Sequence, residues 1–280
     1  MPCARSTGEA AAGEPRAWRP GGLLLGSAAL HGAGLAVAAL FPRSLPSVAA
    51  VLVADHALVI GAGLWPTSRW LGPNLARLPA SERQRRRVGL SFDDGPDPEA
   101  TPEVLDLLDR YRARASFFCV GERVERHPEL AAEIARRGHR VENHTYRHLK
   151  RFSLLGPGAI GREIDRAQAA IEAATGRAPR LLRPPAGLRN ALLEPLLARR
   201  GLWLASWSRR AYDTVRADPR RVARDLVHGV TPGDVLLLHD GGSARGAGGR
   251  PVVLEALPLV LDRLEAAGLT AVALEPPNGG

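Results

Sequence analysis

Two groups of residues in this chain have the types and the spacing of a metal centre. Asp93 and Asp94 are adjacent and follow the apolar run at residues 88–92. His144 and His148 are four positions apart, so on a helical turn they would lie on one face and bind the same metal ion. Two carboxylates this close repel each other unless a cation neutralises one of them. One carboxylate with two imidazoles is a common ligand set for a divalent metal, with positions left for water and substrate.

Each of these motifs has a simpler explanation when it is taken alone. The pair Asp93-Asp94 precedes Gly95-Pro96, and such a pair also suits a capped turn. Two histidines at this spacing also occur on exposed surfaces. Both motifs in one α/β chain, each at the end of a predicted strand, favour the metal site.

Three further residues with catalytic side chains also follow predicted strands. Arg183 begins RPPAG, which is either a rigid surface loop or an arginine that pairs with a carboxylate and holds it ionised. Asp213 ends SWSRRAYD, where a capping or solvated carboxylate is the default interpretation. His239 follows the buried run VLLL and is either a structural histidine or a general acid.

The part of the chain that must position these residues alternates short apolar runs with longer amphipathic stretches. Such alternation predicts a parallel α/β sheet or barrel, with its site at the C-terminal ends of the strands. We expect strands at residues 88–92, 115–120, 181–183, 202–207, 235–238 and 269–274, and a further short strand that ends at Asn143. We expect helices at residues 102–111, 128–137, 159–175 and 252–267.

The first third of the chain contains two long apolar segments. Residues 22–41 carry no charge, and 20 residues are the length that crosses the core of a bilayer. Residues 48–65 are also apolar but contain Asp55 and His56, and a central Asp costs about 2.5–3.5 kcal/mol on insertion scales. The prolines and Ser44 between the segments suit the turn of a helical hairpin. Two buried helices of a soluble domain, or a cleaved secretory signal, are the alternatives.

The excess positive charge lies beside these apolar segments. The net charge is +9, and residues 1–87 hold ten arginines and four carboxylates. The remaining residues are nearly balanced, so we expect no basic face for nucleic acid, and a basic excess beside apolar segments indicates a membrane surface. Only Arg43 lies in the turn of the pair, so if both segments span, the positive-inside rule places both ends in the cytoplasm. If only the first segment spans, the rule gives no side for the C-terminal domain.

These observations divide the chain into four parts. We expect a disordered leader at residues 1–20, membrane-anchoring apolar helices at 21–66, a basic linker at 67–87 and a folded catalytic domain at 88–275. Two cysteines, Cys3 and Cys119, exclude a disulfide framework and a multi-cysteine metal site.

Taken together, the five motifs resemble, in order and spacing, those of the polysaccharide deacetylase family (carbohydrate esterase family 4, the NodB-homology domain). The resemblance covers residues 88–274, about two thirds of the chain. It implies a distorted (β/α) barrel, here preceded by an N-terminal apolar helical hairpin. It also implies one divalent metal ion, usually zinc, and metal-assisted hydrolysis of an N-acyl group, most often N-acetyl, on an amino sugar.

The resemblance also implies roles for single residues. Asp93 would be the catalytic base, and Arg183 would orient it. His239 would be the general acid, and the Asp213 carboxylate would tune its pKa. The metal ligands are Asp94, His144 and His148. The backbone N–H of Ala186 would donate to the oxyanion, and the side chain of Leu237 would line the pocket for the acetyl methyl group.

At two positions the sequence departs from the family pattern. The family often has an aromatic residue where Ala186 stands, and a tryptophan where Thr214 follows the fourth-motif Asp. Both changes remove apolar wall from the substrate groove, so a long glycan is less expected and another acyl-sugar or lipid-linked substrate is more expected. The complete Asp–His–His set argues against a catalytically dead member.

We therefore expect a hydrolase of the bacterial cytoplasmic membrane that removes an N-acyl group from an amino sugar of a cell-envelope polysaccharide or a lipid-linked precursor. The alternatives are a deformylase of a lipid-linked amino sugar and a non-catalytic, membrane-anchored glycan-binding scaffold. The ligand set also suits a non-haem iron oxygenase, although no cosubstrate site is indicated. The sequence sets neither the metal, nor the sugar, nor the oligomeric state.

Overall fold

The C-terminal domain is built on a curled parallel sheet, the half-barrel form of the expected distorted (β/α) barrel. The computed structural model describes residues 14–277, so most of the expected leader lies outside the described residues. The strand order is β5-β4-β3-β2-β1-β7-β6, with β8 paired to β1, and every pairing is parallel. The strands are β1 (Arg87–Asp93), β2 (Ser116–Cys119), β3 (Arg140–Asn143), β4 (Leu181–Leu182), β5 (Trp203–Leu204), β6 (Arg209–Arg210), β7 (Val235–His239) and β8 (Thr270–Val272).

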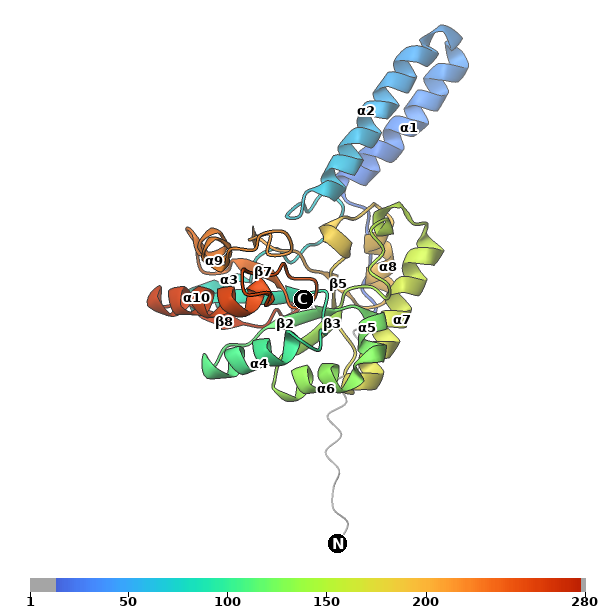
Figure 1. Ribbon diagram of the computed structural model, residues 1–280. Helices are drawn as coiled ribbons and strands as arrows, with labels where there is room; N and C mark the ends of the chain where they lie inside the picture. The colour runs from blue at the N-terminus through green and yellow to red at the C-terminus, as the bar shows by residue number, and fades with distance from the viewer. Residues whose placement is uncertain (1–13, 278–280) are drawn as a thin grey trace.

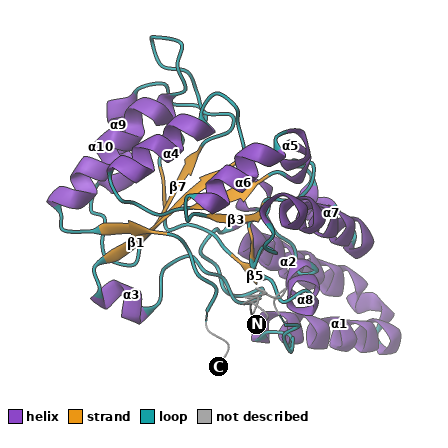
Figure 2. Ribbon diagram, turned by 90° about the horizontal axis from the view of Figure 1, so that it is seen from below, coloured by secondary structure: helices purple, strands orange, loops and turns teal. Residues whose placement is uncertain are grey.

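Helices surround this sheet, as Figures 1 and 2 show. The four expected helices are present as α4 (Thr101–Arg110), α6 (Pro128–Arg136), α7 (Pro157–Thr175) and α10 (Val252–Ala266). Shorter helices that the periodicity did not predict are α3 (Ala80–Gln84), α5 (Gly121–Arg126), α8 (Leu193–Arg199) and α9 (Pro219–Val227). The start of α9 has a clear local cause, because the Asp218 side chain accepts hydrogen bonds from the backbone N–H groups of Arg220 and Arg221.

Both faces of the sheet are buried, and β1 shows how its residues are divided between them. Leu90 and Phe92 belong to the larger core, beneath the outer helices. The residues between and after them, Ser91 and Asp93, point to the opposite face, because successive side chains of a strand alternate. That inner face carries a smaller apolar cluster that includes Phe118, Trp207 and Leu237. The alternation thus delivers polar groups of β1 to the inside of the half-barrel.

The two apolar segments form a helical hairpin that projects from the domain beside α8 (Figure 1). It consists of α1 (Gly22–Leu40), the short turn η1 (Pro42–Ser44) and α2 (Leu45–Leu64). By length and composition both arms can cross a membrane, with mean hydropathies of 1.8 and 1.9. Most of their apolar side chains are exposed, and the only buried one is Ala62. These arms do not serve as the buried core helices of a soluble domain, which was one alternative for them.

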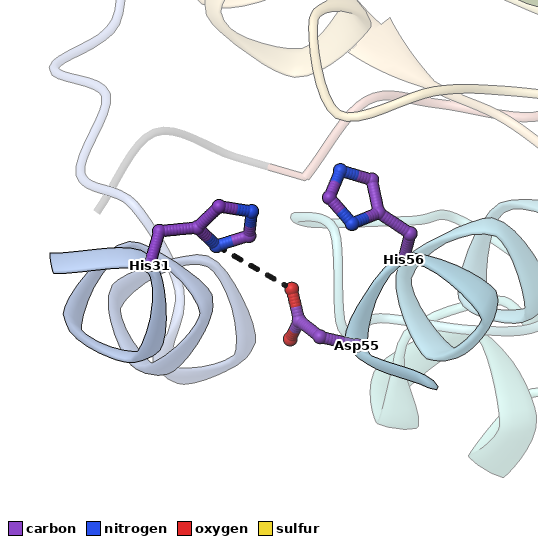
Figure 3. Close-up of side chains that lie close together, drawn as sticks. All are labelled: His31, Asp55 and His56. Carbon is purple, nitrogen blue, oxygen red and sulfur yellow. Dashed lines mark ion pairs between the residues drawn. The ribbon is translucent and has the colours of Figure 1, made fainter. Parts of the chain in front are cut away.

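A polar cluster joins the two arms of the hairpin near their middle (Figure 3). Ser27 Oγ donates a hydrogen bond of 2.6 Å to Asp55 Oδ2, and His31 Nδ1 lies 3.8 Å from the same oxygen. The His31 and His56 rings meet edge to face, with 5.1 Å between their centres. Each Nδ1 also lies within 2.8 Å of the carbonyl oxygen one turn earlier, on Ser27 and Leu52. The costly central aspartate therefore has partners on the other helix.

The segment at residues 67–87, expected as a basic linker, packs on the domain. Leu71, Leu75 and Leu78 are buried, and Leu75 forms a bridge with Ala205 beside β5. Arg77 forms an ion pair of 2.8 Å with the buried carboxylate of Asp234. These contacts fix where the hairpin meets the domain.

Candidate active site

The end of β1 brings two carboxylates beside one imidazole. Asp93 is the last residue of β1, and Asp94 has a left-handed backbone (φ 69°) that turns the chain out of the strand. Asp93 Oδ2 lies 3.8 Å and Asp94 Oδ1 lies 3.3 Å from His144 Nε2. A regular strand would have sent these two side chains to opposite faces, so the turn at Asp94 creates the pocket.

His144 and His148 lie on a loop after β3, and the expectation that they share a helical turn is wrong. Thr145 and His148 have φ values of 64° and 50°, which a right-handed helix does not contain. The loop nevertheless brings the two rings to 4.8 Å between their centres. It also places His148 Nε2 at 3.2 Å from Asp94 Oδ1.

Two buried polar side chains that the sequence analysis did not single out shape this loop. Asn143 Oδ1 accepts a hydrogen bond of 2.8 Å from the backbone N–H of Thr145. Glu163, on α7, accepts from the backbone N–H and from the guanidinium of Arg147, at 2.9 and 2.8 Å. A glutamate on the buried face of an amphipathic helix is a signal in the sequence, but its partner becomes visible only in the fold.

Asp94, His144 and His148 fit a divalent cation. Their ligand atoms lie within 4.8 Å of one another, and Asp94 Oδ1 is a buried oxygen with no hydrogen-bond partner among the described residues. His144 Nδ1 donates to the carbonyl of Arg183 at 2.7 Å, which leaves the Nε2 lone pair for a metal. Burial alone would raise the pKa of Asp94, but the two histidines outweigh it and lower that pKa, so the carboxylate is ionised.

Arg183 is fully buried and holds Asp93 in place. Its Nη1 donates to Asp93 Oδ1 at 2.5 Å and to Ser91 Oγ at 3.0 Å, and its Nη2 donates to the Ser206 carbonyl at 2.9 Å. The guanidinium carbon also lies 3.9 Å from the centre of the Phe118 ring. Burial lowers the pKa of Arg183, Asp93 opposes this, and an arginine stays charged. One oxygen of Asp93 is therefore fixed, and the other faces the metal ligands.

On the other side of Asp93, β7 delivers a histidine paired with a carboxylate. His239 lies opposite Asp93 in the register of β1 and β7. Asp213 Oδ2 accepts from the backbone N–H of His239 at 2.7 Å, and Oδ1 accepts from ring Nδ1 at 2.8 Å. Burial alone would lower the pKa of His239, but Asp213, with smaller contributions from Asp93 and Asp94, outweighs it and raises that pKa above its ordinary value. A histidine that holds its proton to higher pH suits a general acid.

Ala186 and Leu237 complete the set of sequence-predicted residues. Ala186 is exposed in the short turn η3 (Pro185–Gly187) and has a left-handed φ of 55°. Its backbone N–H has no acceptor among the described residues. Gly187 beside it also has a positive φ, and a Cβ there would lie 2.4 Å from the Trp207 ring. Leu237 is buried two residues before His239, so both side chains point to the inner face of the sheet.

Asp240 is a further buried acid near the site that the sequence analysis did not assign. Its Oδ2 accepts a hydrogen bond of 2.6 Å from Thr101 Oγ1, and burial raises the pKa of its carboxyl to about 7. A Cβ on Gly95 would lie 2.2 Å from the same oxygen. Asp240 thus packs under the turn that follows Asp94, where only glycine leaves enough room.

The fold and the residues at its strand ends define a (β/α) half-barrel with two buried ion pairs and a cluster that fits a divalent cation at one mouth. Residues 80–204 match the family model described as polysaccharide deacetylase. The chain is 38% identical over 157 residues to a chitooligosaccharide deacetylase of Bradyrhizobium sp., which is 56% of this chain and 71% of the relative. It is 34% identical over 191 residues to a peptidoglycan-N-acetylglucosamine deacetylase of Bacillus cereus, which is 67% of this chain and 85% of the relative.

Solved structures agree with these sequence matches. A family 4 carbohydrate esterase from Streptomyces lividans, in complex with acetate, is 32% identical with a TM-score of 0.62, and the match covers 69% of this chain and 95% of the esterase. The chain therefore belongs to the polysaccharide deacetylase family. A pseudoenzyme of the same family from Bacillus anthracis shares the fold at 22% identity and a TM-score of 0.65. The same fold therefore occurs with and without turnover, and catalytic activity depends on the side chains of the site.

Proposed function

We propose that this protein is a membrane-anchored, metal-dependent hydrolase that removes the N-acetyl group of an amino sugar. One observation carries the proposal. The pairs Arg183–Asp93 and Asp213–His239 lie at the same mouth of the half-barrel as a three-residue group that could hold a metal ion. The relatives are named as deacetylases of chitooligosaccharides and of peptidoglycan N-acetylglucosamine. The substrate proposed here is correspondingly an N-acetylated amino sugar of a cell-envelope saccharide or of its lipid-linked precursor.

Asp94, His144 and His148 would hold the metal, and two imidazoles with one carboxylate suit zinc. A cation bound there supplies Lewis-acid polarisation of the acyl carbonyl. The hydrogen bond from His144 Nδ1 to the Arg183 carbonyl orients the imidazole toward such a cation. It also links the ligand set to the arginine that holds the base.

Asp93 would act as the base that takes a proton from the attacking water. Its Oδ1 is fixed by Arg183, so Oδ2 is the oxygen that receives the proton. Arg183 would also hold the Asp93 carboxylate in the orientation that this proton transfer needs. The Ala186 N–H, which has no protein acceptor among the described residues, would donate to the developing oxyanion.

His239 would protonate the departing amine. Asp213 engages Nδ1, so the proton available to the substrate is the one on Nε2. The raised pKa of His239 keeps that proton in place to higher pH than an ordinary histidine would. Hydrolysis then yields a free amine and acetate, and Leu237 beside His239 would contact the acetyl methyl group.

The test is the release of acetate and formate from N-acetyl and N-formyl amino sugars by the purified full-length protein. We expect acetate release that depends on zinc, is abolished by EDTA and is lost in Asp93→Asn. Formate release alone would favour the deformylase alternative. Binding of glycan without turnover would favour the scaffold, and oxygen consumption with ferrous iron would favour the oxygenase.

We also propose the domain organisation of the chain. Residues 21–66 anchor it to the bacterial cytoplasmic membrane, and residues 88–275 form the catalytic domain, with 67–87 packed between them. Two exposed apolar helices long enough to span support the anchor. Recovery of the intact protein in carbonate-washed membranes would support this arrangement, and recovery of a shortened soluble form would indicate a cleaved signal instead.

A further inference from the structure

The hairpin is about as long as a bilayer core is thick. Helix α1 has 19 residues and α2 has 20, so at 1.5 Å per residue each arm is about 30 Å long. The hydrocarbon core of a membrane is also about 30 Å thick. The full length of each arm is therefore needed to cross the core, so the domain lies directly at the membrane surface.

Side chains at the base of the hairpin match a membrane interface. Trp18, Trp65 and Trp70 are exposed there, just before α1 and just after α2. Tryptophan concentrates at the level of the lipid headgroups. Arg19 and Arg69, which are also exposed, lie beside them and suit the phosphates at that level. The membrane surface thus coincides with the junction of hairpin and domain.

The domain meets this junction with its catalytic face. The backbone N–H of Arg189 donates to the Gly63 carbonyl at 3.3 Å, and the Arg189 guanidinium donates to the Ser68 carbonyl. Arg189 lies on the loop that follows β4 and is three residues beyond Ala186. The loop that carries the proposed oxyanion donor therefore also contacts the end of α2 and the segment that follows it.

The same face carries exposed apolar side chains, which we call the strand-end rim: Leu154, Leu192, Tyr212 and Val215. They lie on the loops after β3, β4 and β6, and Leu154 and Val215 are 84% and 76% exposed. Among the described residues, every other large apolar side chain with such exposure belongs to the hairpin or its base. Exposed apolar residues gathered on one face indicate an interaction surface.

A groove at the base of the hairpin has the apolar walls that a lipid chain requires. It has a volume of about 560 Å³ and lies between the last turns of α2 and the segment that follows. Leu58, Ala62, Trp65 and Trp70 line it, with Arg69 among its polar residues. An apolar groove with a cation at the level of the headgroups suits a hydrocarbon chain that ends in a phosphate.

We propose that the strand-end rim rests on the lipid surface, and that the site takes an amino sugar carried on a membrane lipid through a phosphate. This inference rests on the proposed function and names its substrate class. The hairpin holds the mouth of the half-barrel toward the bilayer, so a saccharide anchored there reaches the site at high local concentration. A soluble oligosaccharide has no such advantage.

The orientation can be measured without any catalysis. A Cys3→Ser background leaves only the buried Cys119, and a nitroxide is attached to the cysteine of Leu154→Cys or Val215→Cys. The control is Ala266→Cys. This position is exposed at the end of α10, beside the N-terminal ends of the strands and therefore away from the rim. In nanodiscs containing anionic lipid we expect the rim labels to collide with oxygen more than with a water-soluble nickel complex. Rim labels as open to nickel as the control would overturn the proposed orientation.

The substrate class is tested with two substrates in the same vesicles. One is N-acetylglucosamine linked by a diphosphate to a long-chain prenol, and the other is a soluble N-acetylglucosamine oligosaccharide. For the double variant Leu154→Ser/Val215→Ser we expect the ratio of kcat/KM for the lipid-linked substrate to that for the soluble one to fall roughly tenfold. The matched control Ala173→Ser/Ala266→Ser, on the far ends of α7 and α10, keeps the wild-type ratio.

The outcomes separate this inference from the proposed function. Turnover of the soluble oligosaccharide with an unchanged ratio in the rim variant would refute the lipid-linked substrate and leave the deacetylase standing. No turnover of either substrate, with the rim labels in contact with lipid, would refute the deacetylase and keep the orientation. A ratio that falls only in the rim variant supports both.

Discussion

At the scale of single residues, the site contains two separate buried pairs, and the proposed mechanism gives them opposite tasks. The pair Arg183–Asp93 fixes the carboxylate that is proposed to accept a proton. The pair Asp213–His239 fixes the imidazole that is proposed to donate one. Both pairs are buried, so solvent screens neither of them. Removing one partner therefore affects chemistry and stability together.

The substitution Arg183→Met should show this most strongly. It leaves the Asp93 carboxylate buried without its partner, and breaking a buried ion pair costs about 3–5 kcal/mol of unfolding free energy. We expect a lower Tm by calorimetry and no detectable acetate release. Arg183→Lys keeps the charge but not the bonds to both Asp93 and the Ser206 carbonyl, so it should recover stability more than activity. Equal activity of Arg183→Met and wild type would remove the orienting role.

The substitution Asp213→Asn should move the pH dependence in a defined direction. Asp213 raises the pKa of His239, so the protonated acid persists to higher pH in the wild type. In the variant that pKa falls, and the high-pH limb of kcat/KM should shift to lower pH. A histidine with a raised pKa stabilises the fold below its unfolded pKa of about 6.5, and this is lost as pH rises through the folded pKa. The difference in Tm between wild type and variant should therefore be largest on the acid side, and an unshifted profile would exclude the pairing.

At the scale of elements, most strands could be predicted from the sequence, whereas the short strand β6 (Arg209–Arg210) and the conformations of the loops could not. The short apolar run at 88–92 predicted β1, which the structure extends to Asp93. The helical turn expected for His144 and His148 was wrong. One cause is that Glu163 on α7, far from the loop in sequence, accepts a hydrogen bond from the backbone N–H of Arg147. Spacing selected the candidate ligands, and tertiary contacts set their conformation.

The hairpin and the catalytic loop are linked as elements, and one glycine tests the link. A Cβ on Gly63 would lie 2.1 Å from the Arg189 carbonyl oxygen, so Gly63→Val should push α2 away from the loop that carries Ala186. Because small displacements of positioning groups reduce catalysis, we expect a loss of roughly tenfold in kcat on a soluble oligosaccharide. Gly32→Val is the matched control, since no atom lies within 4 Å of its added Cβ. Similar kcat values for the two variants would show that the hairpin anchors the domain without shaping its site.

At the scale of the whole molecule, a bound metal should stabilise the folded chain by mass action. The three ligands come from the ends of β1 and β3 and meet only in the native state, so zinc binds that state preferentially. At a free zinc concentration 100 times its Kd the gain is about 2.7 kcal/mol. Calorimetry should show a Tm that rises with zinc in the wild type and stays constant in Asp94→Asn. A zinc-dependent Tm in that variant would place the cation elsewhere.

The orientation of the whole chain follows from its arginines. If both arms span, Arg16 and Arg19 before α1 and Arg69 and Arg77 after α2 lie on one side, and only Arg43 lies in the turn on the other. The positive-inside rule then predicts a cytoplasmic catalytic domain and a turn outside the cytoplasmic membrane. In a Cys3→Ser background, a membrane-impermeant maleimide applied to spheroplasts should label Arg43→Cys and leave Ala266→Cys unlabelled until the cells are lysed. The opposite labelling would place the catalytic mouth on the outer leaflet, where the same rim would meet saccharides already exported.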